Sequence, residues 1–105
     1  MLTISPDTQC QTVISTFEVT PGTCQDLLDA LNDAYDNFIR HQPGFIAGAI
    51  HVNDAQIRIA TYSQWRRRED FQAMLRTEEM RKRNRHINDL CKSFEPVMYE
   101  VVAGF

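Results

Sequence analysis

The chain has 105 residues, of which 43% are hydrophobic and 24% are charged, and its formal net charge is −3. These values are typical of one globular domain and exclude a largely disordered chain. No apolar run approaches the roughly 20 residues that cross a bilayer, and residues 1–7 lack the basic and apolar regions of a signal peptide. We therefore expect one soluble, cytoplasmic domain over residues 1–105, in which residues 1–10 form an irregular lead-in.

Cysteine and histidine are scattered along the chain. The three cysteines (Cys10, Cys24 and Cys91) are an odd number without a Cys-x-x-Cys pair, so neither a disulfide framework nor a zinc site is expected. The three histidines share no predicted face with a carboxylate, and the sequence contains no glycine-rich phosphate-binding motif. We therefore expect neither a bound metal nor a cofactor.

Charge is distributed unevenly. Residues 1–57 hold seven acids and one base, whereas residues 58–94 hold ten bases and five acids. The basic block indicates either an anion-attracting surface or a solvated helix face whose arginines pair with nearby glutamates and aspartates. We favour the solvated face. A nucleic-acid partner is not expected, because the total charge is negative and no aromatic residues interleave with the bases.

The first half of the chain predicts a strand and a helix. Residues 12–19 are rich in β-branched side chains and are followed by Thr20-Pro21-Gly22, which predicts a strand and its end. Apolar residues then recur at helical spacing from Leu27 onward. We expect this helix to begin at Thr23 as N-cap and to end before Pro43-Gly44.

Residues 45–65 predict a β-hairpin that turns around Asn53-Asp54, with strands at 45–52 and 56–65. Pairing apolar with apolar side chains favours an even-length loop. One face of the hairpin then carries nine residues: Ile46, Gly48, Ile50, Val52, Ile57, Ile59, Thr61, Ser63 and Trp65. The opposite face carries Phe45, Ala47, Ala49, His51, Arg58, Ala60 and Tyr62.

The last third predicts one or two helices over residues 66–94, with Thr77 as a candidate N-cap between them, and a strand over 97–102. The order βαββαβ is that of a ferredoxin-like α+β fold, a four-stranded antiparallel sheet with helices on one face. The other face of the hairpin is small and aromatic. We expect a second copy of the chain to cover it at Ala47, Ala49, His51 and Tyr62, giving a homodimer.

The sequence resembles the antibiotic biosynthesis monooxygenase family of the dimeric α+β barrel superfamily over residues 12–103. Four segments in order carry the resemblance: Val19-Thr20-Pro21-Gly22, Gln42-Pro43-Gly44-Phe45, Tyr62-Ser63-Gln64-Trp65 and Glu69-Asp70-Phe71. The resemblance implies a dimer paired through its sheets, with a pocket in each subunit between the helices and the sheet. It also implies oxidation of aromatic anthrones or quinols by O₂ without metal or flavin.

Trp65 matches the family position on the third strand, and its predicted role is a pocket wall whose indole N–H donates to a substrate oxygen. A core tryptophan at the end of a strand is the alternative. The resemblance also assigns Ser15, Thr61, Ser63 and Phe71 to substrate binding. Thr61 stands where anthrone oxygenases carry an amide, and Ser15 where haem degraders and some oxygenases carry asparagine.

Arg85 corresponds to a pocket arginine of related oxygenases, and we predict that it stabilises an enolate or phenolate, with an exposed helix arginine as the alternative. The adjacent His86 is the candidate base. Haem degradation is not expected, because Met74 and Leu75 stand near the position of the histidine that this branch needs.

Two functions follow from these observations. The first is a cofactor-independent monooxygenase acting on a small anthrone- or quinol-like aromatic compound, with O₂ as co-substrate. The second is a non-catalytic dimeric protein of the same fold that binds a small molecule. Trp65 and the small residues beside it favour the first, whereas the missing amides at Ser15 and Thr61 favour the second.

Overall fold

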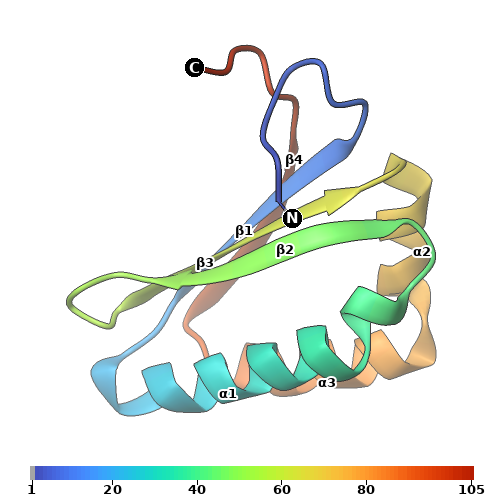
Figure 1. Ribbon diagram of the computed structural model, residues 1–105. Helices are drawn as coiled ribbons and strands as arrows, with labels where there is room; N and C mark the ends of the chain where they lie inside the picture. Colours follow the sequence, from blue (N-terminus) through green and yellow to red (C-terminus); the bar gives the residue numbers. More distant parts are fainter. Residues whose placement is uncertain (1) are drawn as a thin grey trace.

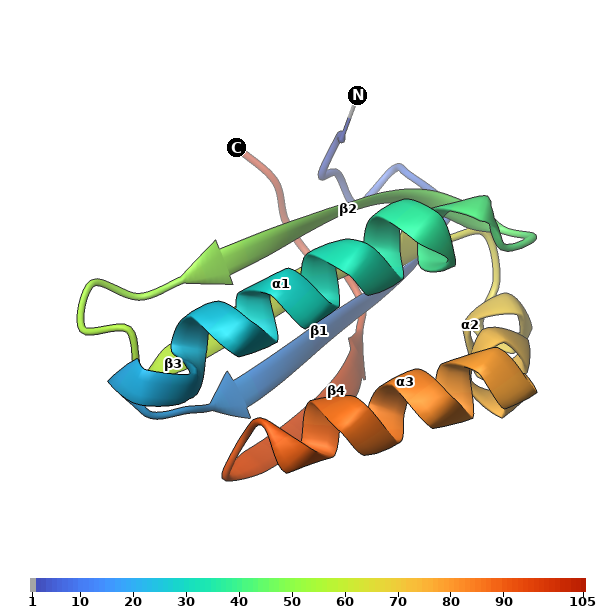
Figure 2. The same ribbon diagram turned by 90° about the horizontal axis from the view of Figure 1, so that it is seen from below.

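A computed structural model describes residues 2–105 (Figure 1). The elements follow in the order β1 (Gln11–Glu18), α1 (Pro21–Asn37), a 3₁₀ turn η1 (Ile39–His41), β2 (Phe45–Val52), β3 (Arg58–Trp65), α2 (Arg68–Arg76), α3 (Glu78–Asp89) and β4 (Ser93–Tyr99). The strands form one antiparallel sheet of order β2-β3-β1-β4. All helices cover one face of this sheet (Figure 2). The predicted ferredoxin-like α+β fold is confirmed.

Helix α1 begins earlier than predicted. Its N-cap is Thr20, not Thr23, and the two threonines form a reciprocal capping box. The Thr23 backbone N–H donates to Thr20 Oγ1 at 3.3 Å, and the Thr20 N–H donates to Thr23 Oγ1 at 3.3 Å. Pro21 therefore occupies the first helical position, where its missing N–H costs no hydrogen bond. The helix ends at Asn37, several residues before the predicted Pro43-Gly44 stop, because η1 intervenes.

The even-length hairpin register is confirmed over most of β2 and β3: Val52 pairs with Ile59, Ile50 with Thr61, and Gly48 with Ser63. The prediction was wrong at the start of β2. Phe45 pairs with Trp65 and Ala47 with Gln64, so a β-bulge leaves Ile46 without a partner. Because the extra residue reverses the side-chain alternation, Phe45 lies on the helix side beside Trp65, and Ile46 is exposed. The strand β3 begins at Arg58 rather than Gln56.

Residues 66–94 form two helices, separated at Thr77. The Thr77 hydroxyl accepts a hydrogen bond from the Met80 backbone N–H at 3.2 Å, so Thr77 caps α3 as expected. The last strand differs from the prediction: β4 spans Ser93–Tyr99 rather than 97–102 and includes Pro96. Proline is tolerated here because β4 lies at the edge of the sheet and pairs with β1 alone.

The opposite face of the sheet, hereafter the outer face, is partly covered by the chain itself. Both terminal segments lie on this side, away from the helices (Figure 1). The Gln64 side-chain amide donates to the Thr3 carbonyl oxygen at 2.6 Å, which buries Gln64 under the lead-in. The other end of the outer face is open, and a hollow of about 620 Å³ lies there beside His51, Ala60 and Glu95.

No helix in residues 2–105 is long and apolar enough to span a membrane.

Candidate active site

Strand pairing brings three small hydroxyl side chains together in the middle of the helix-covered face. Thr61 of β3 pairs with Ser15 of β1, and Ser63 lies two residues further along β3, beside Gly48 of β2. Ser15, Thr61 and Ser63 have exposed fractions of 9%, 3% and 3%. We call these three residues the hydroxyl band. Buried hydroxyl groups are costly unless they are hydrogen-bonded, so they are unusual in the centre of a core.

Trp65 lies next to this band with no solvent exposure. Its Nε1–H donates to Ser63 Oγ at 3.0 Å, so the indole donor is bound to a protein group. The ring packs edge-on against Phe45 and Phe71, with centroid distances of 5.3 and 5.7 Å. The structure thus brings Trp65, Phe71 and the predicted residues of the hydroxyl band into one neighbourhood.

Tyr35 of α1 lies beside this cluster, and in the sequence it falls on the helically spaced stripe that begins at Leu27. The side chains of Thr61 and Ser63 lie near its hydroxyl. Burial raises the pKa of Tyr35 above its ordinary value of 10.0, and the influence of the Thr61 and Ser63 hydroxyls lowers the pKa by less than burial raises it. One feature of the sequence could have drawn attention to Tyr35: it is a tyrosine among the apolar residues of the core-facing side of the helix. A buried tyrosine hydroxyl usually needs a hydrogen-bond partner.

Gly48 allows Tyr35 to reach the band. A Cβ atom at position 48 would lie 3.3 Å from Cε1 of Tyr35 and 3.2 Å from the Tyr62 carbonyl oxygen. The Tyr35 ring therefore packs close to the bare backbone of β2. Both residues also line a cleft of about 490 Å³ between α1 and the edge strand β2, whose other walls include Asn32, Phe45 and Ile50. We call it the α1–β2 cleft.

The predicted Arg85 and His86 lie elsewhere. Both side chains are exposed on α3, and within residues 2–105 neither forms a side-chain hydrogen bond. His86 lines a small groove of about 270 Å³ between α1 and α3, together with Asp33 and Arg83. The structure therefore does not bring Arg85 and His86 into the hydroxyl band.

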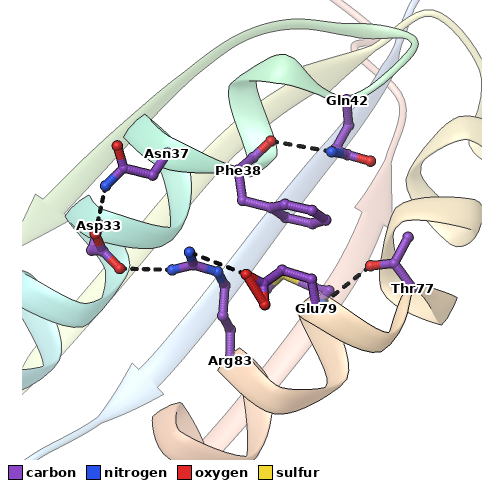
Figure 3. Close-up of polar contacts among 8 residues, drawn as sticks. Asp33, Asn37, Phe38, Gln42, Thr77, Glu79 and Arg83 are labelled. Carbon is purple, nitrogen blue, oxygen red and sulfur yellow. Dashed lines mark hydrogen bonds and ion pairs between the residues drawn. The ribbon is translucent and has the colours of Figure 1, made fainter.

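Arg83 is the arginine of α3 that turns toward α1 (Figure 3). Its Nη1 donates to Asp33 Oδ2 at 2.7 Å, its Nη2 lies 3.6 Å from Glu79 Oε1, and its guanidinium carbon lies 5.9 Å from the centroid of the Phe38 ring. Hydrogen bonds from Arg83 and then from Asn37 hold the pKa of Asp33 below its ordinary value. These contacts hold α1 and α3 together, so this arginine of the basic block has a structural role.

The part of the chain that the structure describes does not offer a set of side chains suited to bind a metal ion. Over residues 2–105, no group of three or more histidine, cysteine, aspartate or glutamate side chains is arranged to hold a metal ion. The cluster is instead a set of neutral donors: three aliphatic hydroxyls, one phenol and one indole N–H. Such a set can hold an oxygen atom that carries developing negative charge.

Residues 11–85 match the family described as antibiotic biosynthesis monooxygenase. Tetracenomycin-F1 monooxygenase of Streptomyces glaucescens is 32% identical to this chain over 108 residues, covering 100% of this chain and 93% of that protein. Among solved structures, SnoaB, a cofactor-independent oxygenase from Streptomyces nogalater, superposes with a TM-score of 0.82 at 14% identity, covering 93% of this chain and 98% of that one.

An anthrone oxidase-like protein superposes with a TM-score of 0.85 at 20% identity over 92% of this chain, which spans 41% of that larger chain. At these identities the superpositions show a common fold. The family match spans most of the chain, and the curated relative covers all of it. On these grounds, and as the sequence resemblance predicts, the chain belongs to the antibiotic biosynthesis monooxygenase family.

Proposed function

We propose that the protein is a cofactor-independent monooxygenase that oxidises a small anthrone- or quinol-like aromatic compound. The observation that carries the proposal is the cluster of neutral donors between the helices and the sheet: the hydroxyl band, Trp65 and Tyr35. Membership in a monooxygenase family supports it. So do a relative named as a tetracenomycin-F1 monooxygenase and a structural neighbour described as cofactor-independent.

The proposed reaction balances without a further reductant. An anthrone loses a proton from its methylene carbon and becomes an enolate, whose negative charge rests largely on the oxygen of the former carbonyl group. The enolate carbon then passes electrons to O₂ and forms a C–O bond, and the resulting peroxide loses water to leave a carbonyl group. The carbon is oxidised by four electrons and O₂ is reduced by four, with one oxygen atom in the quinone and the other in water.

The protein's part in this chemistry is to stabilise the enolate oxygen and to exclude water. Neutral donors fixed in a dry site do this without the reorganisation that water would need. The hydroxyl band, Trp65 and Phe71 are proposed to form the wall of the site. The roles of Arg85 as anion stabiliser and of His86 as base stay predictions. Both side chains are exposed on α3 and lie outside the hydroxyl band.

Oxygen consumption tests the proposal. With 1,8-dihydroxyanthrone as substrate and a chelator present, we expect the protein to consume O₂ well above the spontaneous rate. One O₂ should disappear for each 1,8-dihydroxyanthraquinone formed. Heat-denatured protein at the same concentration serves as the control. Absence of uptake above the uncatalysed rate with a panel of anthrones, hydroquinones and catechols would contradict the monooxygenase proposal.

One observation favours a second candidate, a non-catalytic protein that binds a small aromatic molecule. The indole N–H of Trp65 already has Ser63 as its partner, and Ser15 and Thr61 replace the amides that the resemblance implies for oxygenases. This candidate predicts saturable binding of 1,8-dihydroxyanthraquinone, seen as quenching of the single tryptophan, without any O₂ consumption.

We also propose that the protein is a homodimer joined through the outer faces of two sheets. Small side chains at Ala47, Ala49 and Ala60 lie on this face, and the hollow of about 620 Å³ at its open end leaves apolar surface in contact with water. Burial of apolar surface stabilises association by roughly 25 cal/mol per Å² before the costs of association are counted.

Light scattering at micromolar concentration should therefore report twice the chain mass of 12.2 kDa. Ala49→Arg places a charge in the centre of the outer face, and we expect it to yield monomers. Ala73→Arg, on the exposed side of α2, is the matched control and should leave the mass unchanged. A monomeric wild-type protein would show the proposal to be wrong.

A further inference from the structure

Both ends of the chain lie at the same end of the outer face. The lead-in enters β1 and the C-terminal segment leaves β4 at one end of the sheet, because these two strands pair antiparallel. Both segments lie on the side away from the helices (Figure 1). They also pack on each other, since a Cβ atom added to Gly104 would lie 3.3 Å from Pro6 Cδ and 3.7 Å from the Ile4 carbonyl oxygen. We call residues 2–10 and 100–105 together the terminal ridge.

The terminal ridge exposes apolar side chains. Ile4 is 54% exposed, Val102 is 86% exposed and Phe105 is fully exposed. Single apolar side chains on a surface are ordinary, but three on segments that pack together indicate a contact surface. The sequence of the ridge also contains two acids, Asp7 and Glu100, and no base. The ridge is therefore an apolar surface with a negative charge.

The hollow of about 620 Å³ lies at the opposite end of the outer face. Its lining includes one residue from each strand, in a cross-strand row that runs from His51 through Ala60 and Thr16 to Glu95. Val52 lines the hollow too and is 45% exposed. The ridge of the same chain leaves from the far ends of these strands, so the hollow stays open to another molecule.

The direction of a two-fold axis decides how two such faces meet. When two outer faces stack, the axis lies in the plane between them. An axis parallel to the strands sets ridge against ridge, which brings the acids of two ridges together and leaves both hollows empty. An axis perpendicular to the strands sets each ridge over the hollow of the other copy. There the bases Arg58 and His51 accompany the acids Glu18 and Glu95, so the acids of the ridge find partners.

We propose that two copies of the chain pack in this second arrangement, so that the terminal ridge of each subunit fills the hollow of its partner. The inference rests on the homodimer proposed above and names the segments that join the two subunits. Because the arrangement is symmetric, the same contact forms twice in each dimer.

A pair of charge substitutions tests the arrangement. Val52→Asp places an acid in the hollow and Val102→Lys places a base on the ridge. We expect each change alone to raise the dimer dissociation constant by about 10-fold or more, because an unpaired charge is then buried in the interface. Both changes in one chain should return the constant to within about 5-fold of the wild-type value, because opposite charges then meet across the interface.

Analytical ultracentrifugation over a dilution series measures the dissociation constant, and circular dichroism checks the fold. Ile57→Asp is the matched control. Its side chain is 40% exposed, close to the 45% of Val52, but it lines a groove beside the start of α1 instead of the hollow. This variant should leave the dissociation constant unchanged. The reversed pair, Val52→Lys with Val102→Asp, should show the same recovery and replaces the first pair if Val52→Asp does not fold.

The outcomes separate this inference from the homodimer itself. A monomeric wild-type protein would remove the homodimer and the ridge contact together. If the wild-type protein is a dimer and the single changes at Val52 and Val102 leave its dissociation constant unchanged, the homodimer stands and the ridge contact is overturned. A combined variant that is weaker than either single variant would also overturn it, because ridge would then face ridge. None of these results affects the monooxygenase proposal.

Discussion

Trp65→Ala is expected to lower the free energy of unfolding by about 3–5 kcal/mol, the usual cost of removing a large aromatic side chain from a core. Trp65 has no solvent exposure, and its ring packs edge-on against Phe45 and Phe71. Its loss leaves a cavity between these rings and removes the donor to Ser63 Oγ. Urea denaturation followed by circular dichroism, at one fixed protein concentration, measures the change.

Trp65→Phe is the matched variant that separates packing from hydrogen bonding. Phenylalanine keeps much of the aromatic contact but leaves Ser63 without the indole donor, so we expect a loss of about 1–3 kcal/mol. Quinone binding measured on the same variant, by quinone absorbance, tells whether the indole also matters to a ligand. A cost below about 1 kcal/mol for Trp65→Ala would contradict the central packing role given to this residue.

Gly44→Ala is expected to destabilise the protein by about 1–3 kcal/mol, because two obstacles act at one position. Gly44 has a φ of +86°, a conformation that side chains rarely adopt, and an added Cβ would collide with the side chain of Asp70. A rotation of the Asp70 side chain cannot relieve this collision, since the atoms that an added Cβ would meet include the Asp70 Cβ, which is attached to the backbone. Urea denaturation compares this variant with the wild type.

Gly22→Ala is the control for this prediction. At position 22 the nearest atom to an added Cβ is Thr20 Oγ1 at 3.7 Å, an ordinary contact, and the φ angle is not positive. Alanine in the first turn of α1 should leave stability unchanged or raise it by about 0.4–1 kcal/mol. The double variant Gly44→Ala, Asp70→Ala should recover the part of the loss that comes from the collision. Equal stability of Gly44→Ala and wild type would refute the strain at this turn.

Local sequence patterns were sufficient for the fold class. The alternation of apolar residues in the hairpin determined its even-length register, since a shift by one residue would have turned Ile50 and Ile59 to opposite faces. The Thr77 cap between α2 and α3 was also visible, because a capping hydroxyl acts on backbone groups only a few residues away. The family resemblance likewise depended on short segments in order along the chain, and the match over residues 11–85 confirms it.

The helix and strand boundaries that were predicted wrongly depend on competing local hydrogen bonds or on contacts with residues distant in the chain. Thr20 and Thr23 were both reasonable caps, and the reciprocal hydrogen bonds between them start α1 at Pro21. The last strand was predicted to begin after Pro96, yet Pro96 lies within β4, which accepts a proline because it is an edge strand. That position in the sheet depends on the packing of the whole chain.

The composition of the candidate site was decided by tertiary structure. Thr61, Ser63 and Trp65 share one face of β3, as the alternation of the hairpin predicts, but Ser15 joins them only because β1 pairs with β3. The bulge at Ile46 moves Phe45 to the helix side, which no local pattern indicated. Tyr35 is far in sequence from Thr61 and Ser63, and it lies near them because Gly48 leaves room above β2. The sequence by itself determined which elements form, whereas the hydrogen-bonding partners of the site depend on side-chain contacts between elements distant in the chain.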